Sequence, residues 1–327
     1  MVHGFAREGN AVHMLRLMHV ATDTQGWDHP DVFSDILAVL TNGAEYARRI
    51  SKIPILVETP FGVAYRSAPP FAPGAEALRT ASTGGIPHVD KVLSVFGELG
   101  RGLTMELKPH PGSSTYTVAD LASDSIQRMS LSRECEWTLI AYCDYLADGR
   151  PWKNCRGETF SPTSIAEHLL SLSAAGGACY GCHRPYALAR CVGRERETPG
   201  FLSSPAKHAC ESHLRELSRE LERNQRPDGA WDRNSLPSGR ADKSGASSSD
   251  LPQLEQLLTI TGHNLEWMAM VPQDLRPRDK AISMAIEYLL GLLQSRRDDC
   301  FHFFWPQTSH ALRALVHLST PVGEPIG

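Results

Sequence analysis

Two thiols and an imidazole stand close together in the segment GACYGCH. Cys179, Cys182 and His183 have the spacing C-x-x-C-H, which is typical of covalent haem attachment through two thioether links and an axial imidazole. The same segment could instead supply Cys179 and His183 to a zinc site. His263 or His310 would then be the third ligand, and water would take the fourth position. A third interpretation is a helix start rich in small residues that packs tightly against a neighbouring helix.

A second segment, TGHNLEW, places His263, Glu266 and Trp267 at positions i, i+3 and i+4, so that one helix face carries an imidazole, a carboxylate and an indole. His310 begins the helix expected around SHALRAL, and His183 begins an earlier one. If these helix starts ring one cavity, the histidines converge near Glu266. Imidazole has a pKa of about 6.5, so His263 and His310 could act as base and acid. Alternatively, the histidines only cap helix starts and pack between helical hairpins.

The segment NQRPDGAW has the order Q-x-x-D-G-x-W, in Gln225, Asp228, Gly229 and Trp231. A glycine can adopt the left-handed conformation that ends a helix, and a tryptophan can cover the helix end. We therefore assign these four residues a structural role.

Helical patterns fill most of the chain, and their character alternates. Amphipathic helices are followed by more uniformly apolar ones, which is typical of an outer and an inner layer. This predicts an all-α fold, an α/α toroid of helical hairpins over residues 86–320, although an α-solenoid fits the same pattern. The helices are expected at 88–99, 117–129, 133–147, 162–173, 177–193, 206–225, 255–270, 278–297 and 307–318.

Three segments lack this helical pattern. Residues 1–85 are expected to be loosely ordered, with one helix at 31–50, a short extended piece and a Pro/Gly/Ala-rich linker at 67–87. The Ser/Gly-rich segment 233–253 is expected to be a flexible surface loop.

Composition excludes some classes of protein. The chain of 327 residues has 33 basic and 37 acidic residues, a net charge of -4, and no basic run, which argues against a nucleic-acid partner. No apolar run approaches the roughly 20 residues of a membrane span. The amino terminus shows no signal peptide, so we expect a cytoplasmic protein whose eight cysteines are reduced thiols. Haem c is attached outside the cytoplasm, which makes the haem interpretation the weakest of the three.

Several of these motifs resemble known families. The Q-x-x-D-G-x-W string resembles the QW repeat of squalene cyclases and protein prenyltransferase β subunits, which are α/α toroids. G-H-x-x-E-W resembles a motif of the N-acylglucosamine and cellobiose 2-epimerases, in which two histidines exchange a proton beside a sugar carbonyl. That resemblance implies the same function for His263 and His310. Prenyltransferases and lanthionine cyclases hold zinc in a comparable cavity.

The order of the motifs along residues 85–320 resembles an uncharacterised planctomycete-type bacterial family. The strings HVDKVLSVFGELG, ECEWTLIAYCDYL, WKNCRGETFS, GACYGCHRPYALA, NQRPDGAW, TGHNLEWMAM and SHALRAL carry this resemblance. It implies a terpenoid-cyclase-like toroid without an established activity. That family usually has threonine where this chain has Cys182. The polar residues that the resemblance implies as a shared set are Cys179, His183, Arg184, His263, Glu266, Trp267 and His310.

These observations favour a toroid with a central polar cavity that binds or transforms a small molecule. In this hypothesis Cys179, His183, Arg184 and Trp267 line the cavity. The alternative is a recognition or scaffold toroid without chemistry. Lesser alternatives are an epimerase-like acid–base enzyme, a zinc-dependent transferase and a c-type haem protein. The sequence leaves the substrate, the cofactor and the presence of chemistry open.

Overall fold

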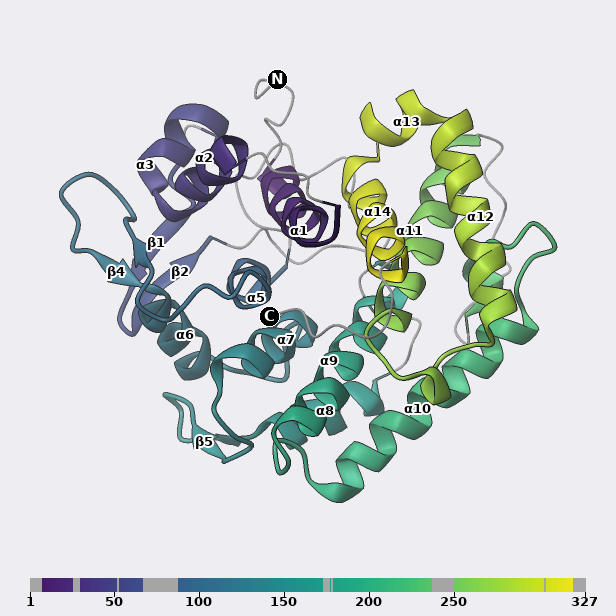
Figure 1. The fold of residues 1–327 in the computed structure, drawn as a ribbon. Coiled ribbons are helices and arrows are strands. Elements are labelled where there is room, and N and C mark those ends of the chain that lie inside the picture. Colours follow the sequence, from purple (N-terminus) through teal and green to yellow (C-terminus); the bar gives the residue numbers. More distant parts are fainter. Residues whose placement is uncertain are drawn as a thin grey trace. The chain divides into compact units, whose positions relative to one another are not determined.

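The computed structural model describes residues 8–25, 30–51, 53–66, 88–172, 177, 179–236, 250–302 and 304–319. These residues are mostly helical, as the sequence predicts (Figure 1). They fall into two compact units, Met1–Ile165 and Ala166–Gly327, and each is described here by itself. Within the described ranges, no helix combines the length and the apolar character that crossing a membrane requires.

The described part of unit 1 combines helices with three small antiparallel strand pairs. In the β1–β2 hairpin, Leu56 pairs with Tyr65 and Thr59 with Gly62. This hairpin is the extended piece that the sequence predicts after the first helical pattern. The elements of unit 1 are α1 (Glu8–Gln25), α2 (Pro30–Thr41), α3 (Gly43–Tyr46), a π-helical turn (Ala47–Ser51), β1 (Leu56–Thr59), β2 (Gly62–Tyr65), α5 (Lys91–Glu98), β3 (Glu106–Leu107), β4 (Tyr116–Thr117), α6 (Val118–Gln127), α7 (Glu136–Tyr145), β5 (Trp152–Lys153), β6 (Thr159–Phe160) and the start of α8 (Pro162–Ser171).

Helix α1 is absent from the sequence prediction, which expected a single helix before residue 85. Its side chains from Ala11 to Val20 are buried on nearly every side, so no amphipathic stripe marks it. Two polar side chains that interrupt the apolar pattern are paired inside the unit. Arg16 forms two hydrogen bonds to Glu98, at 2.7 and 3.1 Å, and His13 Nε2 lies 2.8 Å from Lys91 Nζ. The helical structure of α1 therefore depends on contacts with side chains that are distant in the sequence.

The described part of unit 2 is built almost wholly of helices. Most of the expected loop 233–253 lies outside the described residues, as does the expected linker 67–87. The elements of unit 2 after α8 are a 3₁₀ turn (Cys179–Gly181), α9 (His183–Glu197), α10 (Ser204–Arg223), a 3₁₀ turn (Arg233–Ser235), α11 (Asp250–Met268), a 3₁₀ turn (Gln273–Leu275), α12 (Asp279–Ser295), α13 (Arg297–His302) and α14 (Trp305–Ser319).

Helix α11 is the centre of unit 2 and packs against α9, α12 and α14 (Figure 1). Helices α11 and α14 run parallel, as is shown by contacts that advance in the same direction along both helices. Gln307 donates a hydrogen bond to Glu255 at 3.2 Å, Gly262 faces Ala311, and Glu266 lies beside the side chain of His310. Helices α10 and α12 bury one face each, against α9 and α11 respectively.

The Q-x-x-D-G-x-W segment closes α10 and joins it to α11 and α12. Gln225 Nε2 donates hydrogen bonds to the carbonyl groups of Gly229 and Ala281, both at 2.8 Å. Gly229 has a φ of 92°, and a Cβ there would lie 2.3 Å from the carbonyl oxygen of Met284. The chain can therefore turn this close to α12 only with glycine at this position.

Asp228 and Trp231 complete the same turn. Asp228 accepts a hydrogen bond from the backbone N–H of Ala230 at 3.2 Å, which stabilises the bend. The indole of Trp231 is fully buried and donates to the carbonyl of Leu221 at 3.0 Å. Its backbone N–H donates to Thr261 Oγ1, also at 3.0 Å, which ties the turn to α11. These contacts agree with a structural role for the segment.

Gly262 allows α11 and α14 to pack closely against each other. This close packing gives a first prediction. A Cβ at Gly262 would lie 3.0 Å from the backbone nitrogen of Ala311, whereas one at Gly291 on α12 would meet open space. Gly262→Ala should lower the free energy of unfolding by about 1–3 kcal/mol, because α14 must shift. Gly291→Ala should raise it by about 0.5–1 kcal/mol through helix propensity. Urea unfolding of both variants measures the difference, and equal effects would contradict this packing.

Candidate functional site

Three described helices of unit 2 each carry a buried histidine followed three residues later by a buried polar side chain. The pairs are His183 and Tyr186 on α9, His263 and Glu266 on α11, and His310 and Arg313 on α14. All six are buried, with at most 4% of each residue exposed. Since residues i and i+3 share a helix face, each pair points toward the same side of its helix. We call these six residues the polar cluster.

The histidines of the polar cluster form one layer. The rings of His263 and His310 lie 3.8 Å apart between centroids, tilted by 42°. The ring of His183 meets that of His263 edge to face, with centroids 5.0 Å apart. The three imidazoles therefore lie in a row, with His263 between the other two.

Tyr186, Glu266 and Arg313 form a second layer, one helical turn further along. Glu266 makes most of the contacts in this layer. Its Oε2 atom accepts a hydrogen bond from His310 Nδ1 at 2.7 Å and lies 3.4 Å from His263 Nδ1. Its Oε1 atom accepts a hydrogen bond from Arg313, which also donates to the Tyr186 hydroxyl at 3.1 Å. One buried carboxylate thus joins side chains of α11 and α14, and Arg313 extends the network to α9.

This geometry determines how the imidazoles can act. When His310 donates its Nδ1 proton to Glu266, its Nε2 atom is left as the acceptor. Arg313 balances the negative charge of Glu266 at the other oxygen, which a buried carboxylate requires. A carboxylate with two adjacent imidazoles can orient a histidine for proton transfer or contribute to a metal site.

The sequence correctly places His183 at a helix start, but His310, which was also expected to begin its helix, does not. His263 lies in the carboxy-terminal half of α11, and His310 lies in the second turn of α14. They meet because parallel α11 and α14 pack closely where Gly262 faces Ala311. The convergence therefore depends on the register of two helices rather than on shared helix ends.

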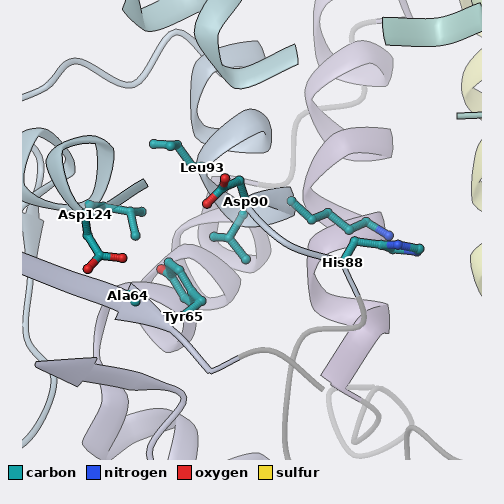
Figure 2. A pocket seen from close by; sticks show the side chains of 9 residues that line it. Ala64, Tyr65, His88, Asp90, Leu93 and Asp124 are labelled. Atoms are coloured by element: carbon teal, nitrogen blue, oxygen red, sulfur yellow. The ribbon is translucent and has the colours of Figure 1, made fainter. Parts of the chain in front are cut away.

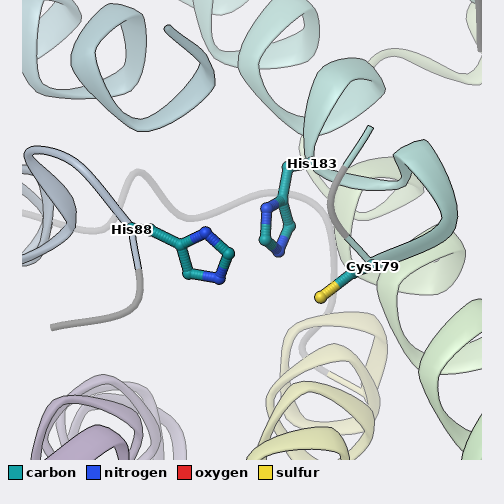
Figure 3. Close-up of side chains that lie close together, drawn as sticks. All are labelled: His88, Cys179 and His183. Carbon is teal, nitrogen blue, oxygen red and sulfur yellow. The ribbon is translucent and has the colours of Figure 1, made fainter. Parts of the chain in front are cut away.

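Cys179 lies in the tight turn before α9 and is half-buried. Its Sγ atom lies within 4.8 Å of a ring nitrogen of His183, and both side chains are visible in Figure 3. The sequence predicts a metal set of Cys179, His183 and His263. Among the described residues of unit 2, the group of potential ligands that contains His263 is instead completed by Glu266 and His310.

Cys182 has a different environment from Cys179. It is 2% exposed, and burial raises the pKa of its thiol to about 12. A porphyrin bonded to this sulfur would have to occupy the packed interior around it, so the burial disfavours the haem interpretation of C-x-x-C-H.

Arg184 and Trp267 are buried and have defined partners. Arg184 donates a hydrogen bond to the carbonyl of Leu172 at 2.9 Å, which holds the end of α8 beside the start of α9. Trp267 Nε1 donates to Asn264 Oδ1 on its own helix, also at 2.9 Å. These contacts stabilise the fold, and the predicted roles of both residues in ligand binding stay predictions.

Sequence reasoning missed Arg313 and Tyr186, although a signal for both was present. Arg313 follows His310 by three residues in SHALRAL, and Tyr186 follows His183 by three residues in CHRPY. The same spacing identified Glu266 after His263. Applying it to all three histidines would have indicated the whole polar cluster.

A cavity lies in unit 1, lined by residues other than those of the polar cluster (Figure 2). Its volume is about 20 Å³, and its lining includes Tyr65, His88, Asp90, Lys91 and Asp124. That volume holds about one water molecule. We therefore do not place a substrate site there.

Comparison with protein-family models, with curated proteins and with solved structures found no match to this chain. The class of the protein is therefore defined by its own geometry: a mostly helical protein with a buried imidazole–carboxylate–guanidinium cluster in unit 2. The resemblance of its motif order to a planctomycete-type family stays a prediction.

The central position of Glu266 gives a second prediction. Glu266→Gln should lower the free energy of unfolding by about 3–5 kcal/mol, because Arg313 would remain buried without its carboxylate. Adding Arg313→Met should recover much of this loss, since both charges are then removed. The control is Glu216→Gln, which breaks an exposed ion pair with Arg219 and should cost about 1 kcal/mol or less. A Glu266→Gln cost as small as that of the control, measured by urea unfolding, would contradict the pairing.

The thiol of Cys182 gives a third prediction. Burial shields the Cys182 thiol from solvent and raises its pKa to about 12, so very little thiolate forms at pH 8. Iodoacetamide should therefore leave Cys182 unmodified in the native protein while it alkylates the exposed Cys155. Peptide mass spectrometry measures both sites, and guanidinium-unfolded protein serves as the control in which both react. Equal native labelling would show that Cys182 is accessible.

Proposed function

We propose that the polar cluster of unit 2 binds a small polar molecule and transforms it, with His263, His310 and Glu266 as the acting groups. The observation that carries this proposal is the buried Glu266 carboxylate, which lies 2.7 Å from His310 Nδ1 and 3.4 Å from His263 Nδ1. Imidazole and carboxylate groups are the side chains that most often move protons or hold metals at active sites.

The energetic cost of the polar cluster supports a functional role. Replacing a buried ion pair by well-packed apolar residues is often neutral or stabilising, so stability alone does not require Glu266 and Arg313. The helices around them already have an extensive apolar core, including Leu258, Leu265 and Ala314. We infer that the charged network is present for binding or chemistry.

We also propose that the helices of unit 2 belong to an α/α toroid. Parallel α11 and α14 would be inner helices, together with α9, and the one-sided α10 and α12 would be outer ones. In this proposal the inner helices present their polar residues to a central cavity. Cys179, His183, Arg184 and Trp267 would contribute to binding there.

A binding experiment tests the proposed function. Sugars and small carbonyl compounds are screened by the rise in melting temperature that they cause. A ligand at 100 times its dissociation constant should stabilise the protein by about 2.7 kcal/mol. The shift should disappear in His263→Gln and in His310→Gln and persist in His213→Gln, a control on α10 outside the polar cluster. Incorporation of solvent deuterium into the bound compound, read by NMR, detects proton transfer.

Two results would contradict this function. One is a ligand shift that persists in both cluster variants, which would place the binding site elsewhere. The other is the absence of any ligand across the screen while both cluster variants unfold below the wild-type temperature, which assigns the histidines to packing and favours the scaffold alternative.

A further inference from the structure

We propose that His263, Glu266 and His310 together bind one divalent transition-metal ion. This inference rests on the proposed function, because it names the cofactor of the same site. One potential ligand atom from each of the three residues lies within 4.8 Å of the other two. Both imidazoles approach the same carboxylate atom, since His310 Nδ1 lies 2.7 Å and His263 Nδ1 lies 3.4 Å from Glu266 Oε2. The three side chains thus converge on one point.

The distances agree with a metal site after a small movement. Ligand bonds of about 2.0–2.2 Å to a tetrahedral zinc ion place neighbouring ligand atoms about 3.3–3.6 Å apart. The separation of His263 from Glu266 already has this value, at 3.4 Å. The His310 contact, at 2.7 Å, is a hydrogen bond that would open by a fraction of an ångström as the ion takes the place of the Nδ1 proton. The neutral imidazole would then carry its proton on Nε2.

The donor set indicates which ions would bind. Two imidazole nitrogens and one carboxylate oxygen suit Zn²⁺, Co²⁺ and Fe²⁺ and leave at least one position for water or substrate. Mg²⁺ and Ca²⁺ prefer several oxygen ligands. Arg313 already balances the only carboxylate of the set, so little negative charge remains to attract a hard cation. We therefore expect selectivity for transition metals.

Neighbouring side chains would support the ligands from outside. Arg313 occupies Glu266 Oε1, which leaves Oε2 to face the two imidazoles, and Tyr186 holds Arg313 in turn. The ring of His183 packs against His263 with centroids 5.0 Å apart and limits its rotation. Such outer contacts orient ligands and typically change metal affinity 10–100-fold when removed. A bound ion would supply Lewis acidity for a carbonyl group or activate a water molecule.

The test is a Co²⁺ titration of the full-length chain after EDTA treatment and dialysis. One equivalent of Co²⁺ should produce a visible d–d absorption band, Zn²⁺ should abolish it, and Mg²⁺ should not. The band should be lost in His263→Gln, His310→Gln and Glu266→Gln. It should persist in Cys179→Ala, which removes a ligand of the alternative set, and in His213→Gln. Arg313→Met should change the affinity by about 10–100-fold.

A further variant separates ligation from folding. His310→Cys keeps a metal ligand at this position, so it should bind Co²⁺ and add an intense sulfur-to-cobalt band in the near ultraviolet. A residue that serves only packing would not produce that band. Circular dichroism of every variant identifies any that fail to fold.

The outcomes distinguish this inference from the function on which it rests. Absence of a cobalt band in folded wild-type protein, or loss of the band in Cys179→Ala, overturns the assigned ligands. If the metal-free protein still binds a small molecule through His263, the metal site fails and the proposed function stands. If the metal binds with the expected variant pattern but no small molecule does, the metal site stands and the proposed function fails.

Discussion

The pairing of the buried Glu266 carboxylate is the interaction on which unit 2 depends. Charge placed in an apolar interior must be paired, and both oxygens of Glu266 are committed, one to Arg313 and one to His310. These bonds form in the observed register, in which α11 and α14 run parallel. Tyr186 extends the same requirement to α9 through Arg313. The pairing of this buried charge and the packing of α9, α11 and α14 thus favour the same arrangement of the helices. That arrangement also brings the imidazoles together.

The turn formed by the Q-x-x-D-G-x-W segment supports that register from outside the polar cluster. The backbone of Trp231 both donates to and accepts from Thr261 Oγ1, at 3.0 and 3.2 Å. Thr261 immediately precedes Gly262, where α11 packs closely against α14. A structural motif therefore holds the part of α11 that presents His263. This explains how residues without chemistry of their own contribute to a site.

Unit 1 follows the same physical rule with different residues. Arg16 pairs with Glu98, and Lys91 contacts His13. Arg16, Lys91 and His13 are buried, and Glu98 is half-buried. The cationic groups of Arg16 and Lys91 both lie over the Trp137 ring, at 5.1 and 5.2 Å from its centroid. These contacts anchor α1 and α5 in the core. They also show why a region with broken apolar patterning is nevertheless ordered, because polar side chains inside a helix can be satisfied by distant partners.

The sequence by itself determined the helical class, the structural turn around Trp231 and the shared face of His263 and Glu266. These features depend on local spacing, which one helix or one turn satisfies alone. Only the tertiary structure decided that α1 is a helix, that His310 meets Glu266, and that Arg313 completes the pairing. A buried helix lacks the amphipathic pattern that reveals a surface one. The contacts of Glu266 join residues 44 and 47 positions apart, and no local spacing encodes the parallel register that brings them together.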